Sequence, residues 1–96
     1  MMKFKQGETV LYHVTVEDGS VASIVSIEAK LRKQTRTLPY PLEGTFVTSA
    51  ILNGWKFTLP VFPAVGKYIT DVKLTMSDGT IRKSSSFDLE ITESVT

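Results

Sequence analysis

The stretch that decides the fold is residues 66–92, GKYITDVKLTMSDGTIRKSSSFDLEIT. In residues 68–76 every second side chain is Tyr, Thr, Val, Leu or Met, and a second, shorter row of Phe, Leu and Ile ends the stretch. A period of two places such a row on one face of a β-strand. Between the rows lies Asp78-Gly79, a pair that suits a two-residue type I′ turn. The stretch therefore predicts an antiparallel hairpin in which Tyr68 faces Leu89.

The register of this hairpin can be followed pair by pair. It places Thr70 opposite Phe87, Met76 opposite Ile81 and Lys67 opposite Glu90, and such matched pairs stabilise a sheet. The predicted register fits less well at two positions, where it sets Val72 opposite Ser85 and Leu74 opposite Lys83, because each pair joins an apolar side chain to a polar one. A β-bulge within residues 84–86 is the expected reason, because one extra residue shifts all later pairs.

Similar rows occur at residues 10–16, 25–31 and 55–59. Asn53-Gly54 predicts a second hairpin turn, with Leu52 opposite Trp55 and Ala50 opposite Phe57. Asp18-Gly19 allows either a hairpin or a looser arch that carries the chain to a second sheet. The apolar rows are rich in β-branched and aromatic residues, which pleated surfaces favour.

The chain has 96 residues, no cysteine and a formal net charge of +1. This length supports one domain, residues 1–96, with one small core and no disulfide. About six or seven short strands in one domain predict an antiparallel β-sandwich or a small barrel. The sequence shows neither a signal peptide nor an apolar span long enough for a membrane, so we expect a protein made in a cytoplasm and no membrane partner.

Gly66-Lys67-Tyr68 stands just before the longest predicted strand. This corner resembles the tyrosine corner of immunoglobulin-like sandwiches, in which the tyrosine hydroxyl bonds backbone a few residues upstream. Here the acceptor would lie near Ala64 or Val65. The resemblance places Thr70 where these domains carry a disulfide cysteine. It therefore implies a cysteine-free immunoglobulin-like β-sandwich; the alternative is that Tyr68 is a core aromatic with a solvated tip.

A second resemblance covers nearly the whole chain. The G-x-Y-x-x-D strand at residues 66–71, the turn at 77–80, the strand at 87–92 and the final Val95-Thr96 resemble small virion-associated proteins of tailed phages, of the head-fibre, baseplate or tail type. Gly7-Glu8-Thr9 before a strand is also similar. The loop at 34–44 departs from that pattern. The resemblance implies a structural or adaptor protein of a virion, assembled in a bacterial host and without catalytic residues.

Catalytic and metal-binding patterns are missing from the sequence. His13 is the only histidine, and no nucleophile elbow accompanies it. Zinc sites need several converging ligands, and Asp71, Asp78 and Asp88 lack the loop pattern of a calcium site. No glycine-rich phosphate loop occurs. We therefore expect no enzyme activity, no metal and no cofactor.

One local charge excess stands out against the near-neutral total. No acidic residue lies between Ala29 and Leu42, and Lys30, Arg32, Lys33 and Arg36 form a basic stripe. The stripe suits either a solvated edge or contact with an acidic neighbouring subunit. Nucleic acid is not expected, since the stripe lacks stacking aromatics apart from Tyr40. Within a homo-oligomer, the acidic complement would come from Asp88, Glu90 and Glu93.

The proline-containing loop at residues 34–44 is the main interaction candidate. Leu38, Tyr40 and Leu42 offer anchor area, and prolines reduce the entropy that a loop loses on docking. The alternative is that this loop covers an open edge of its own sandwich. In the segment at 60–63, we expect Phe62 to cap the end of the core.

These features lead to one expected function and one alternative. We expect a structural or adaptor component of a tailed-phage virion, whose partners are other virion proteins and further copies of this chain. The alternative is a carbohydrate- or surface-binding sandwich module, with Trp55 and Tyr40 as exposed stacking platforms.

Overall fold

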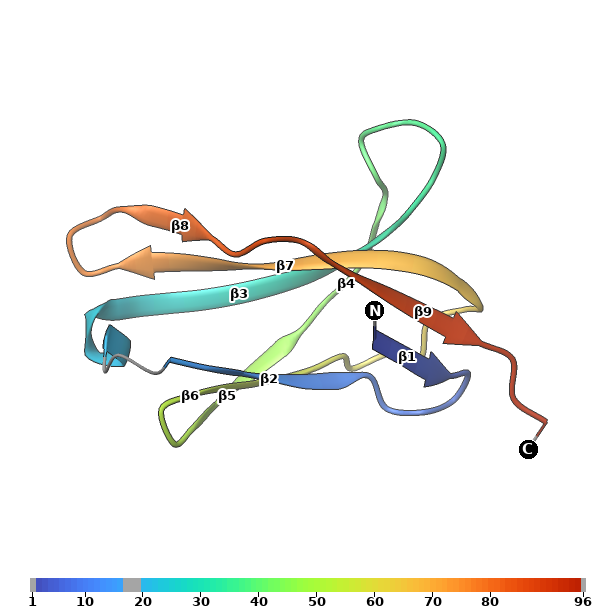
Figure 1. Ribbon diagram of the computed structural model, residues 1–96, viewed down its shortest axis with the longest axis horizontal. Coiled ribbons are helices and arrows are strands. Elements are labelled where there is room, and N and C mark those ends of the chain that lie inside the picture. Colours follow the sequence, from blue (N-terminus) through green and yellow to red (C-terminus); the bar gives the residue numbers. More distant parts are fainter. Residues whose placement is uncertain (1, 17–19, 96) are drawn as a thin grey trace.

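The computed structural model describes residues 2–16 and 20–95 of the chain (Figure 1). In this part there are nine β-strands and one short 3-10 helix, η1, and there is no α-helix. Their bounds are β1 Met2–Lys5, β2 Leu11–Thr15, η1 Ser20–Ser23, β3 Ile24–Lys33, β4 Leu42–Thr45, β5 Val47–Ile51, β6 Gly54–Thr58, β7 Gly66–Met76, β8 Ile81–Lys83 and β9 Phe87–Thr92. No helix of the described residues is long and apolar enough to span a bilayer.

The strands form two sheets. The larger has the order β1-β9-β7-β3-β4, with β8 also paired to β7, and the smaller has the order β2-β6-β5. Figure 1 shows β3, β7 and β8 in one layer and β2, β5 and β6 in the other. The all-β prediction is confirmed. The described residues contain nine strands instead of the expected six or seven, and β1 and β4 are strands that the sequence analysis did not predict.

The core lies between the sheets and combines apolar rows from both. Tyr12 and Phe57 enter from the smaller sheet, and Leu31, Tyr68 and Leu89 enter from the larger one. The rings of Tyr12 and Phe57 stack with centroids 4.9 Å apart. Two further rings meet Tyr12 edge-on, Phe46 at 5.1 Å and Phe87 at 5.3 Å. This aromatic cluster joins the layers in a chain that has no cysteine to staple them.

The hairpin predicted for residues 66–92 is confirmed where β7 pairs with β9. Tyr68 faces Leu89, Thr70 faces Phe87 and Lys67 faces Glu90, as predicted. Its turn is different. Met76 N donates to the Thr80 carbonyl, so the loop has the three residues 77–79, with Gly79 at φ 87°. A three-residue loop that ends in a left-handed glycine is a common hairpin connection, and it shifts the pairs of β8 by one position.

The predicted bulge restores the register between β8 and β9. Lys73 pairs with Lys83 and Thr70 pairs with Phe87. The three residues 84–86 therefore lie opposite only two residues of β7, 71 and 72. Ser84 bridges this gap. Its amide donates to the Val72 carbonyl at 2.9 Å, and its hydroxyl oxygen accepts from the Val72 amide at 2.9 Å. The serine side chain thus replaces the carbonyl that the bulge removes from the ladder.

The Asn53-Gly54 prediction was wrong in register. Ala50 pairs with Trp55 and Ile51 with Gly54, which places the two-residue turn at Leu52-Asn53, with Asn53 at φ 58°. The reason lies at Gly54. A Cβ there would collide with the Val14 carbonyl, so this glycine serves a close approach of β2 rather than the turn.

Asp18-Gly19 lies outside the described residues. Nevertheless, β2 pairs with β6 and β3 pairs with β7, so β2 and β3 belong to different sheets. The alternative of a hairpin between β2 and β3 is therefore wrong.

Two strands of the larger sheet, β1 and β4, escaped prediction, and each precedes a crossing of the chain to the smaller sheet. β1 pairs in parallel with β9, and the chain then crosses to β2 in the other sheet. β4 and β5 follow one another directly, with the buried Phe46 at the crossing and its amide bonded to the Ala29 carbonyl. A strand that changes sheets in this way makes a corner of the molecule.

Candidate functional site

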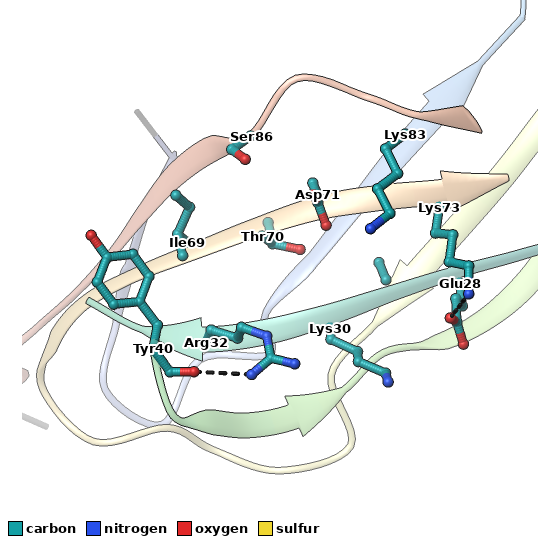
Figure 2. A pocket seen from close by; sticks show the side chains of 11 residues that line it. Glu28, Lys30, Arg32, Tyr40, Ile69, Thr70, Asp71, Lys73, Lys83 and Ser86 are labelled. Atoms are coloured by element: carbon teal, nitrogen blue, oxygen red, sulfur yellow. Dashed lines mark hydrogen bonds and ion pairs between the residues drawn. The ribbon is translucent and has the colours of Figure 1, made fainter. Parts of the chain in front are cut away.

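The outer face of the larger sheet carries a hollow of about 430 Å³. Inward positions of β3 and β7 are buried, so the alternate positions point outward and form its floor. Figure 2 shows the side chains around it, which come from β3, β7, β8, the bulge and the 34–44 loop. The lining residues are Glu28, Ala29, Lys30, Arg32, Tyr40, Ile69, Thr70, Asp71, Lys73, Lys83 and Ser86.

The charge on this face is mixed, with an excess of cations. Four basic side chains and two carboxylates line the hollow, which gives a formal charge of +2. Lys73 Nζ and Glu28 Oε1 lie 3.5 Å apart, the one ion pair among the described residues of this face. Asp71 is the cross-strand neighbour of Lys30. Lys83 lies directly opposite Lys73, so two like charges meet there, an arrangement that costs stability unless an anion is near.

The 34–44 loop forms one wall of the hollow. Arg32 Nη1 donates to the Tyr40 carbonyl at 2.9 Å, and the Lys33 amide donates to the Pro41 carbonyl at 3.0 Å. At its other end, the Gln34 side chain donates to Asp88 Oδ1 at 2.9 Å. These bonds hold both ends of the loop to the larger sheet.

The tip of this loop is left free of the sheets. Figure 1 shows it extending beyond both layers rather than folding back along an edge. Leu38 is 76% exposed at the tip, and the Leu38-Pro39 peptide is cis. The tip of the loop therefore does not cover an edge of the sandwich. Leu42, at the start of β4, is also exposed and pairs with Arg32.

The predicted basic stripe is divided by the structure. Lys30 and Arg32 share the outer face of β3 and line the hollow. Lys33 points to the opposite face, where its Cε lies 3.6 Å from the place a Cβ would take at Gly66. Arg36 lies in the exposed loop. The stripe is thus two residues on the face, one on the reverse side and one in the loop.

Sequence reasoning missed the cations that complete the face, Lys73 and Lys83. Both come from strands that were predicted, and the outward direction of Lys73 follows from the parity of its neighbours Val72 and Leu74. The sequence alone does not reveal that β3 pairs with β7, and this pairing places Lys73 beside Glu28. The one-residue shift of β8 then sets Lys83 opposite Lys73.

The remaining candidates have structural roles. The Tyr68 hydroxyl donates to the Ala64 carbonyl at 2.7 Å, the bond expected of a tyrosine corner. Burial raises the pKa of Tyr68 above its ordinary value of 10.0. Asp78 Oδ1 accepts from the Thr80 amide at 2.9 Å. Hydrogen bonds from the Thr80 side chain and from its amide lower the pKa of that carboxyl. Gly66 adopts φ 156°, just before the corner.

Three further expectations can be compared with the structure. Phe62 is 67% exposed, so it does not cap the core; the short segment between its two prolines holds the ring outside. Trp55 is half-buried and packs against the core, so it is not an exposed platform. His13 is exposed on β2 in the smaller sheet, and the described residues contain no group of three or more metal-ligating side chains.

The acidic residues expected to complement the stripe are partly engaged within the chain. Asp88 accepts from Gln34, and Glu90 Oε1 lies 4.0 Å from Lys3 Nζ at the β1–β9 edge. Glu93 is exposed. The sequence matches no family model, and no curated protein is significantly similar to it.

Proposed function

We propose that this chain is an immunoglobulin-like β-sandwich whose task is protein–protein contact within a tailed-phage virion. The strand order supports the architecture. In immunoglobulin-like domains the second, fifth and fourth strands form one sheet, and the third, sixth and seventh form the other. Taking β2 as the second strand, the smaller sheet β2-β6-β5 and the neighbours β3-β7-β9 follow this order. β4 then extends the larger sheet, as in variable-type domains.

The centre of the core supports the same proposal. Tyr12 on β2 and Thr70 on β7 occupy the two strands that the immunoglobulin disulfide joins. Their side-chain oxygens lie 3.5 Å apart, a long hydrogen bond in place of a covalent link. The chain departs from antibody domains on β3, where Ala29 and Leu31 are the buried residues instead of a tryptophan.

The observation that carries the functional proposal is the loop beside the charged hollow. Its ends are bonded to the larger sheet, and its Tyr40 lines the hollow together with Lys30 and Arg32. Leu38 at the loop tip is exposed, so the loop offers an apolar anchor beyond the rim of this hollow. Interfaces commonly combine one such anchor with a polar rim. The excess of cations favours an acidic protein surface as the partner.

The test uses purified particles of the phage that encodes this chain. Mass spectrometry should find the chain in the virion, and lysine cross-linking should join Lys30 or Lys83 to another virion protein. Lys56, on the outer face of the smaller sheet, is the matched control and should not form that cross-link. The chain's absence from the particles, or cross-links from Lys56 alone, would refute the proposal.

A further inference from the structure

The exposed edges of the two sheets are protected unequally. Among the described residues, five strands have a neighbour on one side only. Edge strands commonly carry charges or proline, which discourage pairing with another chain. Four of these five carry a charged residue or a histidine: Lys3 and Lys5 on β1, Arg82 and Lys83 on β8, Glu43 on β4, and His13 on β2. β5, with the sequence VTSAI, carries neither charge nor proline.

The hydrogen bonds between β2 and β6 indicate which backbone groups of β5 are free. Leu59 N donates to the Val10 carbonyl, and Val16 N donates to the Asn53 carbonyl. Odd-numbered residues of β6 therefore direct their backbone toward β2, and even-numbered ones direct it toward β5. Their partners on β5 are residues 47, 49 and 51. The amides and carbonyls of Thr48 and Ala50 consequently point away from the sheet.

We propose that β5 pairs with β5 of a second copy of this chain, antiparallel and about a two-fold axis at Ser49. In this register Thr48 faces Ala50 of the second copy. Each such pair exchanges two hydrogen bonds, so all four free groups of each strand are satisfied. Val47 faces Ile51 of the second copy, which joins β-branched side chains that are exposed in the single chain.

Charge also favours a second copy on this edge. Self-pairing at β1 or β8 would bring lysines or arginines close to their own counterparts, whereas β5 brings only Val, Thr, Ser, Ala and Ile together. The nearest cation is Lys56, the β6 partner of Ser49. Three strand spacings of about 4.8 Å would separate the two copies of Lys56 by about 14 Å. That distance exceeds the Debye length of about 8 Å at physiological salt, so their repulsion is largely screened.

The first experiment measures the mass of the full chain by sedimentation over a dilution series. The wild type should dimerise. Ser49→Lys and Ser49→Glu keep every β5–β6 hydrogen bond, but each sets like charges directly opposite across the axis, so each should be monomeric. An equimolar mixture of the two variants should restore a dimer, because Lys then faces Glu. A register that does not pair Ser49 with itself would not produce this rescue.

The matched control is His13→Lys. His13, Lys56 and Ser49 lie in one row across the outer face of the smaller sheet, so this variant adds the same charge at the other edge. It should leave the dimer unchanged. Ala50→Pro removes one outward amide from each copy and should raise the dimer dissociation constant at least about tenfold. Trp55 fluorescence reports whether each variant is folded. A wild type that stays monomeric throughout, or a Ser49→Lys variant that dimerises as the wild type does, would overturn the proposal.

Discussion

Removing the Tyr68 hydroxyl tests the corner that anchors β7. In Tyr68→Phe the ring, which is 1% exposed, keeps its place and its apolar contacts, so only the 2.7 Å bond to the Ala64 carbonyl is lost. A hydrogen bond of this kind contributes about 1 kcal/mol net. Because Ala64 is exposed, water can reach its carbonyl, which keeps the loss near this value. For a domain of this size, about 1 kcal/mol lowers the Tm by about 4–8 °C.

The assay is urea unfolding followed by the fluorescence of Trp55. We expect a lower midpoint with an unchanged m value, since the surface exposed on unfolding stays the same. Tyr12→Phe is the matched control. It removes a hydroxyl whose hydrogen bond to Thr70 is 3.5 Å long, so it should cost less than Tyr68→Phe although Tyr12 lies at the centre of the core. Equal losses in the two variants, or no loss in Tyr68→Phe, would refute the reasoning.

Three other perturbations should give measurable effects. Burial raises the pKa of Tyr12 above its ordinary value of 10.0, so the folded state holds this proton more tightly than the unfolded state does. The free energy of unfolding should therefore fall as the pH rises above about 10. In Tyr12→Phe this fall should be less steep. Gly54→Ala would drive a methyl group into the β2 backbone and should cost about 1–3 kcal/mol in urea unfolding, whereas a gain in stability would contradict the close approach. Ser84→Ala removes the hydroxyl that accepts from a β7 amide and should cost about 1 kcal/mol, while Ser85→Ala should be nearly neutral in the same assay.

The sequence predicts best where period and pairing agree. The rows of β7 and β9 place Tyr68 opposite Leu89 in the structure as in the prediction, because a slip of one residue would expose the buried row. Asn53-Gly54 shows the limit of such reasoning. A turn motif was the natural interpretation, but Gly54 is required by a β2 strand almost 40 positions earlier in the chain, and no local pattern reveals that contact.

In the candidate site, too, the alternation within one strand could be predicted from the sequence, whereas the pairing of distant strands could not. Lys30 and Arg32 could be assigned to one outer face from the alternation within β3 alone. Lys73 and Lys83 could join them only once β3 was known to pair with β7, and β8 to be shifted by one residue. β1 was missed for a related reason, since its four residues gain their stability from β9 at the far end of the chain.

The two proposals reinforce each other because they use different parts of the molecule. The hollow lies on the outer face of the larger sheet, whereas β5 is the edge of the smaller one, so pairing at β5 leaves the hollow and the Leu38 loop uncovered. A two-fold dimer would present this surface twice. Contacts that are weak singly become strong when two are made at once, provided that the partner repeats with a matching spacing, as a virion subunit does. The monomeric Ser49→Lys variant should therefore bind a repeating partner more weakly than the wild type, yet bind a single isolated copy of that partner equally well.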